Sequence, residues 1–580
     1  MANHPALTRL AALCAAAVLT ACGGGGSDSP ASPAPTGAAD APSAPPPASP
    51  PPASPPPAEA PGFSLTLSTD KALVIQGQTA TITATVTRKA GFDGAVSVVL
   101  NKLPAGVSAA AVIITAGATS APITLSAQAG AAHSLPTAAS ANGAGGTGNA
   151  ITASQPLTVT VGGRPGMVDT SFGGGNSGGA QLTDVGEGED YAFAMAVQAD
   201  GKVVTVGRTS TNAGGTDIAI TRHLRDGTLD PAFGTGGKVV TAIAAGRGSD
   251  EARAVLVEPD GKIVIGGYTD AGGTNKDFLV ARYNPNGMLD TTFGDGGKTV
   301  TNIGNGTDQV YALARQADGK IVAGGSAAFS GSTGQDFALV RYNVDGSLDA
   351  GFGTGGKVTT AIGSFGASEL IYAITLQTIG GEQRIVAVGG EGSFIAARYL
   401  SNGQLDPAFG EAGKLIGIMT STIGSAESVT LSADNKIVIG GHIGHEFNLV
   451  QLNVDGSLDA GFGTGGRVVT PVSSTNWDEA TSVVRQSDGK LLVGGWVYDG
   501  VSSDGNFVVL RYEANGQPDA GFGNAGRVVT NVSPTGRSDS GRALSLQLDE
   551  RITTVPTVRV LQAGEASDGG YKFALLRYWL

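Results

Sequence analysis

Residues 278–294 read FLVARYNPNGMLDTTFG, and variants of this stretch recur along most of the chain. The stretch ends in the pattern Asp-x-x-Phe-Gly. This pattern occurs seven times in the chain, at intervals of 61, 60, 59, 57, 53 and 60 residues. Its aspartates are Asp169, Asp230, Asp290, Asp349, Asp406, Asp459 and Asp519. Such a period indicates that one supersecondary unit is repeated, with each copy burying its apolar face against the next.

The units between these marks share one order of segments. A Lys-Val-Val-Thr-like strand comes first, followed by an Ala-rich strand, an Asp-Gly-Lys turn, a strand ending in Gly-Gly and a Phe-x-x-x-Arg-Tyr strand. Asp-Gly pairs accept the positive φ that tight hairpin turns require. Seven units of four strands, with no helical stretch, predict an all-β fold in which residues 166–580 form a seven-bladed β-propeller.

These features resemble the delta-60 repeat family, whose hallmarks are the Asp-x-x-Phe-Gly pattern, the Asp-Gly-Lys turn and the Arg-Tyr strand. The resemblance implies a propeller, but the family has no settled biochemical activity. Three units depart from the pattern: Gly380-Gly381-Glu382-Gln383 replaces the turn in the fourth, Gln451-Leu452 replaces Arg-Tyr in the fifth, and Asp549-Glu550-Arg551 stands at the turn in the seventh. The departures put local geometry in question, not the fold.

The two ends of the array predict how the ring closes. If the Ala-rich strand is innermost and the Lys-Val-Val-Thr strand outermost, the chain stops at Leu580 one strand short. We expect residues 181–185 to supply that strand by pairing with the strand around residues 573–578. This pairing would also cover an otherwise exposed sheet edge.

The N-terminus has the pattern of a lipoprotein leader. Residues 1–21 carry an apolar run typical of a signal peptide, and the run is too short to span a ~30 Å hydrocarbon core. Leu19-Thr20-Ala21-Cys22 resembles the lipobox of bacterial lipoproteins, which implies cleavage before Cys22 and acyl chains that anchor its sulfur in a lipid bilayer. By the sorting rule of that class, Gly23 in place of Asp implies the outer membrane, on the periplasmic side or the cell surface.

Two segments separate the leader from the repeats. Residues 22–61 contain half of the 28 prolines and predict a disordered linker, because such a composition cannot bury a core. Residues 62–162 alternate apolar and polar side chains and predict a β-sandwich of about seven strands. The runs Gly91–Val96 and Leu103–Val107 resemble a bacterial immunoglobulin-like module. The resemblance implies a spacer, with glycan binding as the alternative.

The two faces of the predicted propeller differ in how much they vary between units. The tight turns are nearly identical from unit to unit, whereas the loops at the opposite ends of the strands differ in every unit, and varied loops on a rigid scaffold commonly carry binding specificity. The position aligned at the start of the Ala-rich strands is Phe193, Arg253, Tyr311, Tyr372, Glu427, Thr481 and Arg542.

Aromatic residues also gather in the loops of the sixth unit. Trp477, Trp496 and Tyr498 are candidates for one patch. With nearby Asp478, Asp499 and Asn506, it would suit a sugar ring or a partner protein. The alternative is that the tryptophans only cover the top of the sheet.

We expect a monomeric, non-catalytic binding module for an envelope protein or polysaccharide. The alternatives are a propeller enzyme, either a lactonase-like hydrolase or a polysaccharide lyase, and a purely structural envelope component. Against an enzyme, the aligned ring offers one acid, Glu427, and the sequence contains no catalytic motif or cofactor site that we recognise. Two segments are alternatives for a metal site, but the turn at residues 343–349 lacks the bidentate acid of a calcium loop, and His442 and His445 lack a third ligand. A net charge of -13 argues against a nucleic-acid partner.

Overall fold

The computed structural model describes residues 60–580 apart from residue 135 and the segments 176–177, 245, 271–274, 330–333, 364–367, 420–422, 474–476, 499–504, 534–537 and 550–556. The predicted signal peptide, Cys22 and nearly all of the linker lie outside the described residues. The regular structure of the described part is β-strand apart from two short 3-10 segments, η1 (Thr147–Asn149) and η2 (Phe172–Gly175). No helix in this part is long and apolar enough to cross a bilayer.

The first nine strands form two sheets that share one hydrophobic core. The first sheet has the order β1 (Gly62–Leu67), β3 (Thr79–Lys89), β7 (Ser120–Ala127), β5 (Val107–Ala109). The second has the order β2 (Lys71–Ile75), β9 (Ile151–Gly162), β8 (Thr137–Gly145), β4 (Val96–Asn101), β6 (Val112–Ile114). Along β3, Ile82, Ala84 and Val86 are buried and alternate with threonines, as the period-two pattern predicts. This part is therefore a β-sandwich, with nine strands where about seven were expected.

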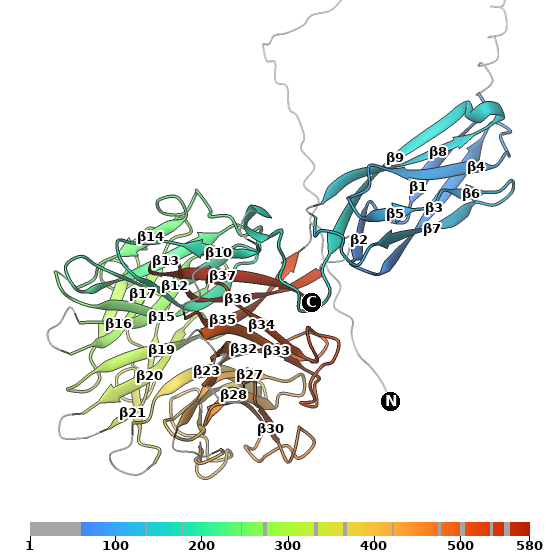
Figure 1. Ribbon diagram of the computed structural model, residues 1–580. Coiled ribbons are helices and arrows are strands. Elements are labelled where there is room, and N and C mark those ends of the chain that lie inside the picture. Colours follow the sequence, from blue (N-terminus) through green and yellow to red (C-terminus); the bar gives the residue numbers. More distant parts are fainter. Residues whose placement is uncertain are drawn as a thin grey trace, which may run out of the picture. The chain divides into compact units, whose positions relative to one another are not determined.

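The remaining strands form seven four-stranded antiparallel sheets, each built from consecutive strands except the last (Figure 1). The first strands are β11 (Asp190–Val197), β15 (Asp250–Val257), β19 (Asp308–Arg315), β23 (Ile371–Ile379), β27 (Gly424–Leu431), β31 (Asp478–Arg485) and β35 (Ser540–Asp549). The second strands are β12 (Val203–Ser210), β16 (Ile263–Thr269), β20 (Ile321–Ala328), β24 (Glu382–Gly389), β28 (Ile437–Ile443), β32 (Leu491–Tyr498) and β36 (Thr557–Ser567).

The outer half of each sheet completes this pattern. The third strands are β13 (Thr216–His223), β17 (Asp277–Tyr283), β21 (Gln335–Tyr342), β25 (Ile395–Tyr399), β29 (Glu446–Leu452), β33 (Gly505–Tyr512) and β37 (Tyr571–Trp579). The fourth strands are β14 (Lys238–Thr241), β18 (Lys298–Thr301), β22 (Lys357–Thr360), β26 (Lys414–Leu415), β30 (Arg467–Thr470), β34 (Arg527–Thr530) and β10 (Ala180–Thr183). The predicted order, Ala-rich strand first and Lys-Val-Val-Thr strand last, is confirmed.

The first strands contact one another in a closed circle. Each packs on the first strand of the next sheet, and β35 of the last sheet returns to β11 of the first. The second strands are buried on both faces because a neighbouring sheet covers each side. For example, Val204 and Val206 of β12 share a core with Ile263 and Ile265 of β16. These strands therefore read as short continuous apolar runs instead of alternating ones.

The last sheet takes its fourth strand from the beginning of the array. β10 pairs antiparallel with β37, with Ala180 opposite Leu576 and Thr183 opposite Phe573, and in Figure 1 the teal β10 lies beside the red β37. The predicted closing pair is confirmed, although the strand begins one residue earlier and ends two residues earlier than expected. Residues at the two ends of the array thus belong to one sheet.

Candidate binding site

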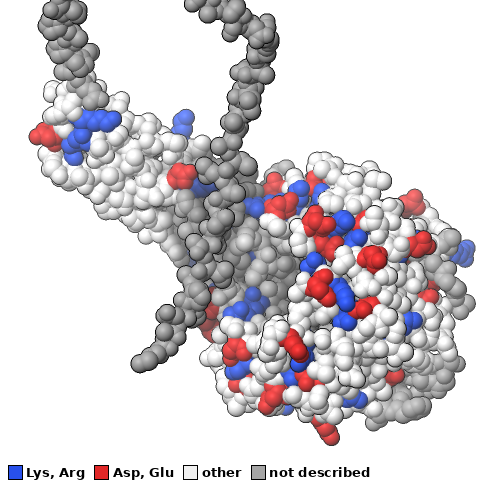
Figure 2. Space-filling view, turned by 180° about the vertical axis from the view of Figure 1, so that it is seen from behind, with Lys and Arg blue, Asp and Glu red and all other residues white. Residues whose placement is uncertain are grey.

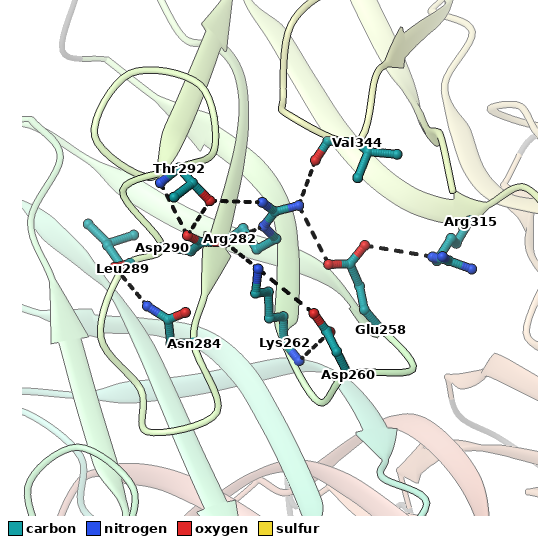
Figure 3. Close-up of polar contacts among 10 residues, drawn as sticks. All are labelled: Glu258, Asp260, Lys262, Arg282, Asn284, Leu289, Asp290, Thr292, Arg315 and Val344. Atoms are coloured by element: carbon teal, nitrogen blue, oxygen red, sulfur yellow. Dashed lines mark hydrogen bonds and ion pairs between the residues drawn. The ribbon is translucent and has the colours of Figure 1, made fainter. Parts of the chain in front are cut away.

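The turn ends of the sheets are held together by the residues of the repeat signature (Figure 3). Nε of Arg282 donates to Oδ2 of Asp290 at 2.8 Å, and Nζ of Lys262 lies 3.0 Å from the same oxygen. The guanidinium also lies 4.7 Å from the ring centre of Phe293 and donates to the carbonyl of Val344, in the next repeat, at 2.6 Å. Burial opposes ionisation of Asp290, but the hydrogen bonds that it accepts hold its pKa below the ordinary value.

The same contacts recur around the array, even where the sequence departs from the signature. The Arg–Asp pairs are Arg222–Asp230, Arg282–Asp290, Arg341–Asp349, Arg398–Asp406, Arg511–Asp519 and Arg577–Asp169. In the fifth unit, Nε2 of Gln451 donates to Asp459 at 2.7 Å. In the fourth, where the turn lysine is missing, Nε of Arg384 lies 3.5 Å from Asp406. The arginine and aspartate of the repeat signature therefore have a structural role: their contacts hold neighbouring repeats together.

Toward the other end of each first strand, one residue is left out of the register with the second strand. In β11, Ala192 pairs with Gly207 and Ala194 pairs with Val206, so that Phe193 forms a β-bulge. The seven bulge residues are Phe193, Arg253, Tyr311, Tyr372, Glu427, Thr481 and Arg542. They are the seven positions aligned from the sequence. A bulge bends the strand and redirects the side chain of the extra residue.

A glycine stands opposite each bulge because the two backbones approach too closely for a side chain. A Cβ added at Gly325 would overlap the carbonyl oxygen of Gln309. The equivalent glycines in the seven sheets are Gly207, Gly267, Gly325, Gly389, Gly441, Gly495 and Gly564. The glycine that recurs near the end of every second strand is therefore required by the bulge.

The seven bulge side chains line one cavity of about 520 Å³, together with Tyr191, Arg208 and Glu479. Because the first strands form a closed circle, each sheet contributes one bulge residue to the cavity. The volume falls within the range of roughly 300–1,000 Å³ that is common for small-molecule pockets. The structure thus brings all seven aligned positions together.

On one side of the cavity, two arginines share a buried carboxylate. Nη1 of Arg208 lies 3.0 Å from Oε2 of Glu251, and Nε of Arg253 lies 2.5 Å from Oε1. The guanidinium of Arg253 is placed between two rings, 4.8 Å from the centre of Phe193 and 5.2 Å from that of Tyr311. Cation–π contacts of this kind hold a guanidinium in position.

Glu427 supplies a buried carboxyl group from a sheet across the ring. Burial raises its pKa to about 7, and the nearby Glu479 adds to the rise, while Arg542 and Arg253 oppose it. The hydroxyl of Ser425 donates to this carboxyl. Near neutral pH the group is divided between its protonated and ionised forms, so it can donate or accept a hydrogen bond.

Glu479 connects the cavity with the aromatic patch of the sixth unit. Its Oε1 accepts from Nε1 of Trp477 at 2.9 Å, and its Oε2 accepts from Nε1 of Trp496 at 3.1 Å. Trp496 makes an edge contact with Tyr498 at 5.3 Å between ring centres, and the ring of His445 lies 4.5 Å from Trp477. Although its indole N–H is hydrogen-bonded, Trp477 remains 40% exposed, which is a large fraction for a tryptophan side chain.

One expectation about an acidic residue is wrong, and Asp499, which was named with it, lies outside the described residues. Asp478 is fully buried and accepts the backbone N–H groups of Val472 and Ser473, so it holds a loop and does not face a ligand. Glu427 is the one acid among the seven aligned positions, as expected, and Glu479, which is not an aligned position, adds a second acid to the cavity lining.

The sequence comparison missed three lining residues. Tyr191 and Glu479 stand two positions before a bulge residue, where the period of a strand returns to the same side, and this spacing was the signal that could have identified them. Arg208 lies on a second strand, directly after the glycine opposite the bulge, and nothing in the repeats marks it.

No metal centre is apparent in the described part of the chain, where no three His, Cys, Asp or Glu side chains are grouped to hold an ion. The turn around Asp345, whose spacing of oxygen ligands is weakly similar to that of a calcium loop, is an Asx turn. Oδ1 of Asp345 accepts the backbone N–H and the hydroxyl of Ser347, at 3.0 and 2.7 Å.

Comparison with known families agrees with this architecture. Six segments match the family model described as a domain of unknown function (DUF5122) beta-propeller, namely residues 198–233, 258–293, 316–352, 378–409, 432–462 and 486–522. Each segment ends on the phenylalanine of Asp-x-x-Phe-Gly. The chain therefore carries β-propeller repeats of this family between residues 198 and 522.

Other comparisons add little. No curated protein matches the chain. Among solved structures, a DUF4784 family protein from Bacteroides caccae is 10% identical, with 80% of this chain and 98% of that chain covered and a TM-score of 0.24. A similarity at this level carries no argument about fold or function.

Proposed function

We propose that the seven sheets are the blades of a closed, seven-bladed propeller of the delta-60 type, preceded by an immunoglobulin-like spacer. The closed circle of first strands and the pairing of β10 with β37 support this proposal. Negative-stain or cryo-electron microscopy of the full chain tests it, because seven-fold density around one centre is expected and any other number of blades would contradict it.

The chain is further proposed to be an outer-membrane lipoprotein, with residues 1–21 removed and Cys22 acylated. The lipobox-like sequence supports this assignment. Cells grown with radiolabelled palmitate should incorporate label into the protein and carry it in the outer-membrane fraction. Cys22→Ser should abolish both. Label that persists in the variant would contradict lipidation at this residue.

The propeller is proposed to act as a non-catalytic binding module for an envelope protein or polysaccharide. The observation that carries this proposal is the convergence of seven different bulge side chains on one cavity, while the opposite ends of the sheets repeat the same structural contacts. A scaffold that varies at only one end is typical of a protein that binds there.

The expected partner is not a nucleic acid. The chain has a net charge of -13, and Figure 2 shows acidic and basic side chains interspersed on the face in view, without an extended basic area among the described residues there. Nucleic-acid binding by phosphate contacts needs such an area.

Capture from the bacterial envelope tests the binding function. The full chain, purified in detergent, would be immobilised beside Tyr311→Ala/Tyr372→Ala, which opens the cavity lining, and Trp477→Ala/Trp496→Ala/Tyr498→Ala, which removes the patch. Met288→Ala is the control, because Met288 is 67% exposed and lies in a turn on the opposite face. Retention of a component by wild type and control, and loss with the cavity variant, is expected. Equal retention by all four proteins would contradict the site, and no retention would favour a structural role.

An enzymatic function is the second candidate, and one observation favours it. Glu427, with its pKa raised to about 7, shares a cavity with Glu479, and two carboxyl groups in different environments are the usual arrangement for general acid–base chemistry. Glu427→Gln distinguishes the functions. If the protein is a hydrolase or lyase, the wild type should release shortened products from its captured component and Glu427→Gln should bind the component without releasing any. If it is a binding module, neither protein should release products.

A further inference from the structure

The charges that line the cavity are separated across the ring. Arg208 and Arg253, from the first two sheets, share the carboxylate of Glu251. Lys276 lies close enough to interact with these three groups and with Asp270, so positive charges outnumber negative ones on that side. Glu427 and Glu479 stand on sheets five and six, across the circle of first strands. A ligand with a negative group at one end and hydrogen-bond donors at the other would match this arrangement.

Part of the positive side has no partner of its own. Nε of Arg208 is buried and, within the described residues, has no hydrogen-bond partner. Its guanidinium lies 4.8 Å from the ring centre of Tyr191, and the side chain lines the cavity. By contrast, Arg542 has a carboxylate to itself, since its Nη2 lies 3.0 Å from Oε1 of Glu565. A buried donor without a partner usually marks a place where water or a ligand completes the site.

The rest of the lining favours a sugar over a simple anion. Tyr191, Phe193, Tyr311 and Tyr372 supply aromatic rings, and Tyr311 and Tyr372 make an edge contact with 5.3 Å between ring centres. Rings of this kind cover the apolar C–H surface of a sugar, while a few placed polar groups bind its hydroxyls.

We propose that the cavity binds a carboxylate-bearing saccharide, with the uronate carboxylate at Arg208 and Arg253 and the sugar hydroxyls toward Glu427 and Glu479. This inference rests on the proposed function, in which the cavity is the binding site, and it deepens that function by naming the ligand class. The exposed Trp477, whose indole N–H donates to Glu479, extends the site to the next sugar unit of the bound saccharide.

Paired oligosaccharides test the inference. Tetrasaccharides of gluco, galacto and manno configuration would be compared with counterparts oxidised to uronates at C6, by isothermal titration calorimetry with the full chain in detergent. At least one uronate is expected to bind at least 10-fold more tightly than its neutral partner, because charge-assisted hydrogen bonds are the stronger ones. Added salt should weaken only the uronate.

Arg208→Gln should remove most of this preference without unfolding the protein, because Glu251 keeps its ion pair with Arg253. Arg225→Gln is the charge-matched control, since within the described residues the Arg225 side chain donates to the backbone carbonyl of Asp200 at the turn face and to no cavity residue. Thermal unfolding of both variants checks that they fold. A preference that survives in Arg208→Gln would overturn the assignment of the carboxylate site.

The remaining outcomes separate this inference from the function on which it rests. Equal binding of neutral and oxidised sugars would overturn the acidic class while leaving a saccharide-binding cavity. Absence of binding to every sugar, together with capture of an envelope protein that the cavity variant loses, would overturn the inference and keep the binding function. Absence of both would contradict the two proposals together.

Discussion

Nη2 of Arg577 lies 2.7 Å from Oδ2 of Asp169, although 408 positions separate the two residues in the chain. In the other units the aspartate follows its partner by eight positions, and this partner is an arginine, as in Arg282–Asp290, except for Gln451 in the fifth unit. The first Asp-x-x-Phe-Gly therefore completes the last sheet and not the first. This ion pair and the β10–β37 ladder join the two ends of the array.

Asp169→Ala should destabilise the protein strongly, because it leaves the buried guanidinium of Arg577 without its carboxylate. Loss of one member of a buried ion pair costs about 3–5 kcal/mol. The free energy of unfolding in urea measures the effect. Asp260→Ala is the control, since the Asp260 side chain is 57% exposed and its loss should cost no more than about 1 kcal/mol. Similar values for the two variants would contradict a structural role for the ring closure.

Gly325→Ala should disturb the bulge of the third sheet, because the new methyl group would overlap the carbonyl of Gln309. Forced packing of this kind costs about 1–3 kcal/mol. It should also displace Tyr311 and weaken binding in the cavity. Thermal unfolding and titration with the captured ligand measure the two effects.

Gly461→Ala is the matched control for this substitution. The nearest atom to its Cβ would lie 3.4 Å away, and the equivalent turn positions already carry alanine at Ala232 and Ala408. We expect a change in stability within about 0.5 kcal/mol. If Gly325→Ala is equally mild, the glycine is not required by the bulge.

His223 should make the protein sensitive to acid. It takes the place of a tyrosine that binds a threonine in five of the other six sheets, the exception being the sheet with Leu452, and its Nε2 lies 3.3 Å from the hydroxyl of Thr183 on the closing strand. Burial lowers its pKa to about 4. The unfolded chain therefore binds a proton more readily than the native one, so stability is full above pH 6.5 and falls, by about 3 kcal/mol at most, as the pH drops toward 4.

His223→Tyr should remove this dependence. It installs the residue found at Tyr283 and Tyr342, whose hydroxyls bind Thr241 and Thr301. Urea unfolding at pH 7.5 and pH 5 compares the two proteins. A wild-type stability that changes no more than that of the variant would show that this histidine does not carry the effect.

Glu427 should give the opposite dependence on pH. Because burial raises its pKa to about 7, the native state holds this proton more tightly than the unfolded chain does. Its contribution is full below pH 4.5 and is lost as the pH rises through 7, by about 3 kcal/mol at most. The charged groups around it are Glu479, Arg542 and Arg253. Glu427→Gln should be more stable than wild type at pH 8 and similar at pH 5, and a variant that is less stable at pH 8 would contradict this account.

The all-β repeat architecture was predictable because the same order of strand and turn patterns recurs seven times in the sequence. Asp-Gly turns mark the hairpins, and an array that ends one strand short needs a strand from its beginning, which is how β10 was predicted. The departures from the signature could not be interpreted from sequence. Gln451 and Arg384 keep the contacts of the residues that they replace, and only the positions of the neighbouring carboxylates reveal this.

The candidate site was predictable only in part. Alignment of the units identified the bulge residues, because each occupies the same place in its strand. Arg208 and the contacts of Glu479 depend on how strands of different sheets face each other, which no repeat pattern encodes. Asp478 was misread for the same reason, since its partners are backbone amides of the preceding loop.

The bulges also bear on how such a chain can change its ligand. Every sheet presents one bulge side chain to the cavity through the same backbone geometry, and these seven side chains already range from Thr481 to Tyr372 and Arg542. The backbone thus accommodates small, aromatic and charged residues at the equivalent bulge position. Specificity in this architecture is modular, and a library that varies only these seven codons would sample new ligand preferences on an unchanged scaffold.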